Sequence, residues 1–349
     1  MKYSFYDDYS EGVHPEILRY IGEHNDDQQL GYGRDNYSQL AADRIRKAFG
    51  LPHADVHFSP SGTATNVICL RAMLQPYEGV ITPHSGHIYV HETGAPEAAG
   101  IKLIPVPSQD GKLTTDMIDS AFGTYEDEHT IIPRVVYLTQ ATELGTVYSP
   151  SELQTIINHA KAKGLLVFID GARLAMALTS KNKGMSTTNF GSLGADIFYV
   201  GGTKAGGMYG EAIVIVNPEL QHHFRNQMKQ RGALMAKGRF MGQQFARFFD
   251  QDGLWMALGA QANENAAYMH RRLAEAGMDF DLTVDANQVF PIIENTLVEE
   301  LEKDYGFYRW TKVSDTQTKI RLVCSWATPV AAIDKFIDRV TELRHAKGQ

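Results

Sequence analysis

The chain has few cysteines and no long apolar segment. Its 349 residues include two cysteines, Cys69 and Cys324, each in an apolar stretch typical of a buried position. Two isolated thiols support neither a disulfide framework nor a metal site. No stretch approaches the roughly 18 uninterrupted apolar residues of a membrane-spanning helix, and the N-terminus lacks the apolar region of a signal peptide. We therefore expect a cytoplasmic protein that binds neither a membrane nor a metal.

Positive charge is also scarce. The chain carries 33 Lys and Arg residues against 41 Asp and Glu residues, for a formal net charge of −8, and it has no long basic run. Nucleic acids and anionic membrane surfaces are bound through clusters of lysine and arginine, so neither is the expected partner. Hydrophobic residues make up 43% of the chain, as in ordinary globular proteins. The expected partner is a small molecule.

Short apolar runs alternate with amphipathic stretches between residues 50 and 216. Helical patterns such as 66–74, 115–122 and 151–163 lie between several of the apolar runs. This alternation predicts an α/β protein with a mainly parallel seven-stranded sheet flanked by helices. The expected strands are residues 54–58, 79–83, 101–106, 134–139, 165–170, 196–201 and 211–216.

A second, smaller unit follows the sheet. Residues 218 to about 277 have the pattern of long helices, residues 287–293 and 319–324 that of strands, and residues 329–346 that of a final helix. Because the chain exceeds the length at which one core stops growing, we expect two domains. They are a large domain over 1–250, with the N-terminal segment, and a small C-terminal α/β domain over 251–349.

A lysine and an aspartate predict the chemistry. Lys204 stands between two glycine pairs, which remove side-chain bulk around it, and Asp170 ends an apolar run. Parallel strands deliver catalytic side chains at their carboxyl ends. Alone, Asp170 is typical of a helix cap and Lys204 of a surface lysine. Together they predict a pyridoxal 5'-phosphate (PLP) enzyme, in which Lys204 forms the Schiff base and Asp170 keeps the ring nitrogen protonated.

A phosphate site is expected upstream. Ser61-Gly62-Thr63 follows a strand and opens a helix, so its backbone N–H groups and hydroxyls suit an anion. An ordinary helix cap is the alternative. The order of this stretch before Asp170 and Lys204 favours the phosphate.

Other polar residues complete the predicted site. His87, five residues before Glu92, is placed to stack on the cofactor ring or to move a hydroxyl proton, although a lone histidine is more often structural. His84 and His91 are interpreted as structural. Arg173 is expected to contribute a positive field that favours neutral Lys204.

These residues resemble the threonine aldolase and β-eliminating lyase family of PLP enzymes, which have the aspartate aminotransferase-like fold (fold type I). The resemblance covers nearly the whole chain. It is carried by Tyr32-Gly33, residues 61–66, His87-Ile88-Tyr89 with Glu92, residues 170–173, residues 201–204 and residues 321–323.

The resemblance implies a homodimer or tetramer with sites at the subunit interface. Residues 229–240 are either part of a neighbouring phosphate site or a solvated helix face.

The resemblance also implies specific site residues. For Arg321 a surface ion pair is the alternative. The implied cofactor site is Ser61, Gly62, Thr63, His87, Asp170, Arg173, Thr203 and Lys204, and the implied substrate contacts are Arg173 and Arg321, which clamp the carboxylate, with Tyr32 and Thr142.

Two departures from the family pattern stand out. Typical members carry Asn-Thr-His after the strand that ends here at Thr139, and Thr142 falls where that histidine would be. The stretch 139–143, with 325–328, is similar to the phenylserine aldolase branch, which implies a β-substituent larger than methyl. A serine of the carboxylate clamp is replaced by Asp7 or Asp8; because an acid repels a carboxylate, neither is included in the predicted site.

The implied reaction is retro-aldol cleavage of a β-hydroxy-α-amino acid (threonine, allo-threonine or phenylserine) to glycine and an aldehyde. His87, directly or through water, is the expected base for the β-hydroxyl, and Glu92 is the second candidate. The alternatives are β-elimination or another PLP reaction at the same site, and a non-catalytic ligand-binding protein with the same fold.

Overall fold

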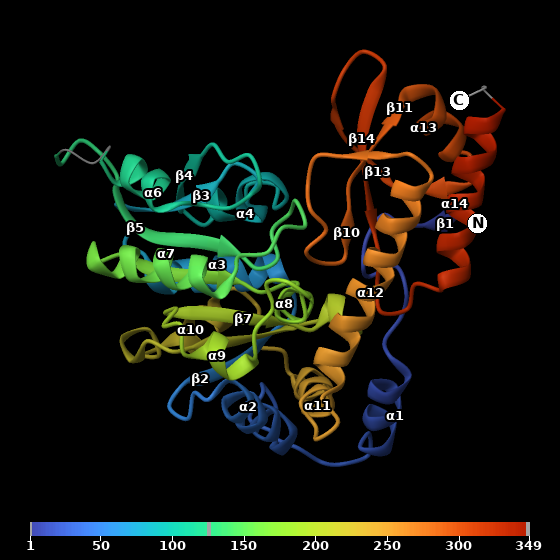
Figure 1. Ribbon diagram of the computed structural model, residues 1–349. Coiled ribbons are helices and arrows are strands. Elements are labelled where there is room, and N and C mark those ends of the chain that lie inside the picture. Colours follow the sequence, from blue (N-terminus) through green and yellow to red (C-terminus); the bar gives the residue numbers. More distant parts are fainter. Residues whose placement is uncertain (1, 124–126, 347–349) are drawn as a thin grey trace.

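The computed structural model describes residues 2–123 and 127–346. Its central element is a seven-stranded sheet, which lies in the large unit (Figure 1). The strand order is β2-β8-β7-β6-β5-β3-β4. Strands β4, β3, β5, β6 and β7 are mutually parallel, and β8 is antiparallel to both β7 and β2. The expected mainly parallel sheet is confirmed. Its strands are β2 (Asp55–Ser59), β3 (Glu78–Pro83), β4 (Lys102–Val106), β5 (Ile132–Thr139), β6 (Leu166–Asp170), β7 (Ile197–Gly201) and β8 (Glu211–Ile215).

Both faces of this sheet are covered, because its strands carry apolar side chains on both sides. In β5, Val136 and Leu138 pack into one core and Val135 and Tyr137 into the other. Strands buried on both faces have continuous apolar runs, which explains why the sequence pattern located them well. The first core is covered by α2 (Asn36–Phe49), α6 (Thr115–Phe122), α7 (Pro150–Ala162), α8 (Leu174–Leu178), α9 (Thr187–Gly191) and α11 (Arg239–Phe248), and the second by α3 (Gly62–Met73), α4 (His87–Val90) and α10 (Phe224–Gln230).

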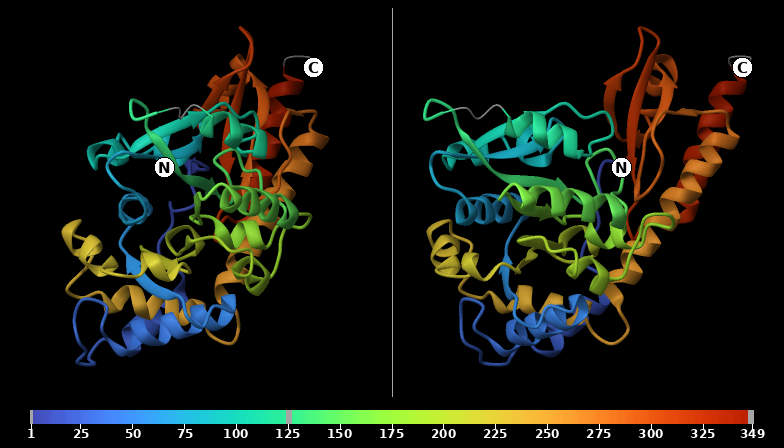
Figure 2. Two further views of the ribbon diagram at one scale, coloured as in Figure 1. Left: turned by 90° about the vertical axis from the view of Figure 1, so that its left-hand side faces the viewer. Right: turned by 60° about the vertical axis from the view of Figure 1, so that its left-hand side comes forward.

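A smaller C-terminal unit has its own sheet and core. Two helices cover it: α13 (Asn295–Leu301) and α14 (Val330–His345). The long helix α12 (Leu254–Glu275) runs from the large sheet to this unit (Figure 2) and contributes to both cores. The small sheet consists of β9 (Asp279–Phe280), β10 (Gln288–Val289), β11 (Pro291–Glu294), β13 (Tyr308–Lys312) and β14 (Gln317–Val323).

The N-terminal segment reaches the small unit. Strand β1 (Tyr3–Ser4) pairs in parallel with β12 (Tyr305–Gly306), and Phe5 is fully buried in the C-terminal core. The chain then returns to the large unit through α1 (Pro15–Glu23). The remaining short elements are α5 (Ala95–Ala98), η1 (Thr203–Ala205) and η2 (Pro218–Leu220).

No helix in the described part of the chain combines the length and the apolar character needed to cross a bilayer.

Candidate active site

A cleft at the carboxyl ends of β5, β6 and β7 brings together four of the predicted site residues: His87, Arg173, Lys204 and Arg321. Lys204 lies on η1, directly after β7, and Arg173 lies just after β6. The small unit contributes side chains from β13 and β14, so both units form the walls. The cleft is lined by Tyr9, His87, His91, Glu143, Arg173, Lys204, Tyr308, Trp310 and Arg321.

The glycines around Lys204 are required by backbone packing. A Cβ added at Gly202 would lie 2.6 Å from the carbonyl oxygen of Gly210, and one at Gly207 would lie 2.7 Å from the carbonyl oxygen of Gly202. A Cβ at Gly201 would overlap the Ala172 carbonyl. These glycines therefore allow neighbouring backbone to approach the segment that carries Lys204.

Asp170 is a buried carboxylate held by donors. It accepts hydrogen bonds from the hydroxyls of Tyr137 (2.6 Å) and Tyr199 (2.5 Å) and from Asn66 Nδ2 (3.1 Å). Burial opposes ionisation, but the charge of His87 and the two tyrosine hydroxyls lower the pKa of Asp170 below its ordinary value. Asp170 thus stays negative and suits a partner that carries a protonated nitrogen.

Lys204 lies in surroundings that favour its neutral form. Burial and the neighbouring Arg173 charge lower the pKa of Lys204, while Asp8, Asp170 and Glu211 act in the opposite direction. Arg173 thus contributes the positive field expected of it. A lysine with a lowered pKa is a better nucleophile toward an aldehyde.

Thr203, beside Lys204, is directed at Glu211. The Thr203 hydroxyl donates to Glu211 Oε1 (3.1 Å), and the Gly202 N–H donates to Glu211 Oε2 (2.9 Å). Burial raises the pKa of Glu211 to about 8. Glu211 thus fixes the segment that carries Lys204.

His87 lines the cleft and is oriented by Glu92. Nδ1 of His87 lies 2.9 Å from Glu92 Oε1, which also accepts from Asn66 Nδ2 (2.7 Å). Glu92 is only 6% exposed and does not line the cleft. Its position suits holding the His87 ring, not removing a proton from a substrate.

Arg173 is bound to an acid that the predicted site omitted. Its Nε donates to Asp8 Oδ2 (2.7 Å) and its Nη2 to Asp8 Oδ1 (3.1 Å), and Asn287 Nδ2 donates to Asp8 Oδ2 (2.8 Å). Burial would raise the pKa of Asp8, but the charges of Arg173 and Lys204 lower it. The adjacent Asp7 instead accepts from the Tyr9 N–H and the Ser10 hydroxyl.

Arg321 faces the same cleft from the small unit. Its guanidinium lies 4.7 Å from the Tyr308 ring centre and 4.9 Å from that of Trp310, and its Nη2 donates to the Tyr6 carbonyl (3.2 Å). Its buried Nε has no hydrogen-bond partner within residues 2–123 and 127–346. Burial and the nearby Arg173 lower the pKa of Arg321. The surface ion pair considered for Arg321 is not observed among these residues.

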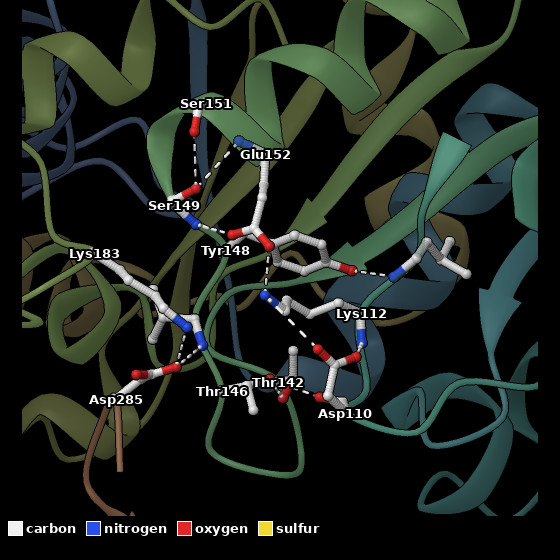
Figure 3. A network of polar contacts seen from close by, with 12 residues as sticks. Asp110, Lys112, Thr142, Thr146, Tyr148, Ser149, Ser151, Glu152, Lys183 and Asp285 are labelled. Carbon is white, nitrogen blue, oxygen red and sulfur yellow. Dashed lines mark hydrogen bonds and ion pairs between the residues drawn. The ribbon is translucent and has the colours of Figure 1, made fainter. Parts of the chain in front are cut away.

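Two predicted substrate contacts lie elsewhere. Thr142 is fully buried, and its hydroxyl lies 2.7 Å from that of Thr146 (Figure 3), so it is directed away from the cleft. Tyr32 is 44% exposed and lies beside Lys229, whose Nζ is 4.6 Å from the Tyr32 ring centre. Neither residue lines the cleft that contains Lys204.

Conversely, Glu143 and His91 line the cleft although neither is among the predicted site residues. Glu143 directly follows Thr142, which the family pattern singles out, and the sequence gives no sign of which of the two side chains faces inward. The interpretation of His91 as structural does not anticipate its place in the cleft.

The proposed phosphate residues lie at the start of α3. Ser61 caps this helix by accepting from the Ala64 N–H (3.3 Å), so the ordinary cap considered for this turn is present. Ser61 and Thr63 also line an opening that includes Arg231. Hydroxyls, free helix N–H groups and a guanidinium form a suitable donor set for a phosphate. With anionic Asp170 and reactive Lys204, the residues fit a cofactor that carries a phosphate, a basic ring nitrogen and an aldehyde.

Similarity to known proteins extends over almost the full chain. A low specificity L-threonine aldolase from Pseudomonas aeruginosa is 34% identical over 341 residues, which cover 97% of this chain and 94% of that protein. A low specificity L-threonine aldolase from a Pseudomonas species is 34% identical over 331 residues, covering 94% of this chain and 93% of that protein. The structure of a threonine aldolase from Leishmania major has a TM-score of 0.95 and 42% identity, covering 98% of this chain and 99% of that one.

More distant structures share the fold alone. An aromatic aminotransferase from Pyrococcus horikoshii has a TM-score of 0.71 at 16% identity, covering 99% of this chain and 96% of that one. The aminotransferase-like fold expected from the resemblance is confirmed. Residues 15–296 match the β-eliminating lyase family. Because this match covers most of the chain and the similarity to both aldolases covers nearly all of it, the chain belongs to the β-eliminating lyase family, whose members use pyridoxal phosphate.

Proposed function

We propose that this protein is a PLP-dependent aldolase that cleaves β-hydroxy-α-amino acids of the L-threonine type to glycine and an aldehyde. The observation that carries the proposal is Lys204, whose lowered pKa favours the neutral amine, in a cleft with Arg173 and Arg321. The near-full-length similarity to low specificity L-threonine aldolases supports the same reaction.

Residues from four elements, α3, α4, β6 and η1, would hold the cofactor. Lys204 would bind its aldehyde carbon, Asp170 its ring nitrogen, and Ser61, Gly62 and Thr63 its phosphate. His87, oriented by Glu92, would lie against the ring. When bound, pyridoxal phosphate withdraws electrons from the substrate Cα and so stabilises the negative charge left by bond cleavage.

The two arginines would position the substrate. Arg321 offers its unpartnered Nε, and Arg173 offers the edge of its guanidinium that Asp8 leaves free. Arginine donors suit a carboxylate because their planar geometry matches its two oxygens. Fixing the carboxylate orients the Cα–Cβ bond, and orientation decides which bond breaks.

Aromatic side chains in the cleft support a substrate of the phenylserine type. Tyr9, Tyr308, Trp310 and His91 line it together with Lys204. Aromatic rings favour contact with another ring in tilted or offset arrangements. We therefore propose that an aryl β-substituent is accepted at least as well as the methyl group of threonine.

We also propose that the protein is a homodimer or tetramer with sites at the subunit interface. Leu30 is 70% exposed and Tyr32 is 44% exposed on a surface that also carries Arg34, Arg225 and Lys229. A second subunit on this surface would bury the apolar side chains and bring Tyr32 and the basic residues toward a neighbouring site. Light scattering with size-exclusion chromatography tests this; a monomer would contradict it.

The reaction is tested with purified protein, PLP and either L-threonine or L-phenylserine. Aldehyde and glycine are measured against ammonia and keto acid, with Lys204→Ala as the inactive control. Equal amounts of aldehyde and glycine are expected. Ammonia without aldehyde would establish β-elimination instead, and a protein that gains no visible absorption with PLP would be a non-catalytic member of the fold.

A further inference from the structure

Glu143 occupies the cleft, and the chemistry proposed above does not use it. It follows β5 and is only 5% exposed. It lines the cleft together with Lys204, His87 and His91. Because it lines the cleft that contains Lys204, Glu143 is placed to contact a substrate bound there.

The two oxygens of Glu143 have different surroundings. Oε1 accepts from the backbone N–H of His87 (2.9 Å) and from the Thr139 hydroxyl (3.1 Å). Oε2 is buried and has no hydrogen-bond partner in the part of the chain that the structure describes. A buried, unpartnered carboxylate oxygen is unfavourable unless it carries a proton or meets a ligand. The first oxygen thus fixes the side chain, and the second oxygen is left without a partner.

The burial of Glu143 and the charges around it allow both of its protonation states near neutral pH. Burial raises the pKa of Glu143 to about 7, and the negative charge of Asp170 acts in the same direction. Its own backbone N–H, His87 and Thr139 oppose this rise. A group whose pKa lies near the working pH is suited to both accept and donate a proton. The titratable groups that face it are His87, Tyr137, Tyr148, Asp170 and Arg173.

The other candidates for proton transfer are less available. Nδ1 of His87 is engaged by Glu92, and the ring is assigned to the cofactor. Thr142, where the family pattern places a histidine, bonds to Thr146. Burial, with the charges of His87 and Arg321, lowers the pKa of His91, which weakens it as a base.

We propose that Glu143 is the catalytic residue that exchanges the proton of the substrate β-hydroxyl through Oε2; the inference rests on the proposed aldolase function. In cleavage the β-oxygen loses its proton to Oε2, and the electron pair of that O–H bond becomes the second bond of the aldehyde. The Cα–Cβ bond breaks with its pair on Cα. Glycine then gains one proton at Cα from solvent and Glu143 returns one to solvent, so the net change moves one proton from oxygen to carbon.

The test is Glu143→Gln, which keeps an oxygen for the His87 N–H and the Thr139 hydroxyl but cannot take up the proton. We expect kcat/KM for L-phenylserine to fall by about 10²–10³-fold. Exchange of the glycine α-proton with deuterium, followed by NMR, does not involve a β-hydroxyl and should be retained. The visible absorption of the bound cofactor should also be unchanged. Glu264→Gln, an exposed carboxylate on α12, is the matched control.

The pH profile gives a second measurement. In the wild-type protein kcat/KM should fall as the pH drops below about 7, because the base becomes protonated. The Glu143→Gln variant should lack this limb. Unchanged cleavage by the variant would overturn the proposal, as would an equal loss of cleavage and α-proton exchange. If the wild type forms no aldehyde, the proposed function itself fails.

Discussion

Asp8 and Arg173 form a two-point ion pair across 165 residues of sequence, with Nε 2.7 Å from Oδ2 and Nη2 3.1 Å from Oδ1. The pair fixes the plane of the guanidinium and leaves its other edge toward the cleft. Asp8 therefore acts as a positioning residue for the group proposed to bind the substrate carboxylate.

Replacing Asp8 by Asn should raise KM for L-threonine by about tenfold or more, since hydrogen bonds to charged groups are worth about 1.5–3 kcal/mol. The physical reason is the loss of a fixed Arg173 orientation. Steady-state kinetics measure it, with Asp7→Asn as a control that changes the same charge one residue away. A lower KM in Asp8→Asn would show instead that Asp8 competes with the substrate carboxylate.

Replacing Tyr199 by Phe should reduce the free energy of unfolding by about 1–3 kcal/mol, because Asp170 loses a buried donor to its charged form. Urea denaturation at pH 7 measures the change. Tyr77→Phe, at a side chain 59% exposed, should change little. Equal stability of the Tyr199→Phe and wild-type proteins would mean that the hydroxyl does not stabilise Asp170.

Replacing Gly171 by Ala should lower stability by about 3 kcal/mol or more, because the new methyl group overlaps the carbonyl oxygen of Tyr199. Gly22 provides the contrast. It lies in α1, where an added Cβ would meet nothing within 4 Å, so Gly22→Ala should stabilise by up to about 1 kcal/mol. Thermal unfolding of both variants checks the difference, and similar melting temperatures would contradict it.

His57 should make the fold sensitive to acid. Burial lowers the pKa of His57 to about 4, and its Nε2 has no hydrogen-bond partner among the described residues. The folded state favours neutral His57. Its contribution to the free energy of unfolding is therefore complete above the unfolded pKa of about 6.5, and it is lost as the pH falls toward 4. The loss of stability is at most about 3.5 kcal/mol, at about 1.4 kcal/mol per pH unit.

His57→Phe should reduce this acid sensitivity, because phenylalanine cannot bind a proton. The new ring should be accommodated, since the His57 ring already stacks on Phe224 with centres 5.3 Å apart. Urea denaturation at pH 7.5 and pH 5 measures the difference. An identical pH dependence in variant and wild type would show that another group is responsible.

The sequence located the large sheet to within two residues per strand end. The expected strands 54–58 and 165–170 correspond to Asp55–Ser59 and Leu166–Asp170. Continuous burial on both faces produces this clear signal. The small sheet was harder, because the single strand expected over 287–293 is two strands, Gln288–Val289 and Pro291–Glu294. Pro291 lacks the N–H that would continue a ladder.

The site was predictable where it lies at strand ends. Asp170 is the last residue of β6 and Lys204 follows β7, and the carboxyl ends of these parallel strands lie at the same edge of the sheet. The Asp8–Arg173 pair was not predictable, because nothing local signals a contact across 165 residues. Glu143 was missed because it lies in an irregular loop. No helical or strand periodicity in the sequence indicates there whether residue 142 or residue 143 faces inward.

The N-terminal segment connects the small C-terminal unit to Arg173 of the large one. Tyr3 and Ser4 are hydrogen-bonded to β12, the Phe5 N–H donates to Gly306, and the Phe5 carbonyl accepts from Val323. Asp8, three residues after Phe5, forms the ion pair with Arg173 beside the large sheet. A shift of the small unit relative to the large one would therefore displace Asp8 and turn the Arg173 guanidinium, so the relative position of the two units and the binding of the substrate carboxylate would change together.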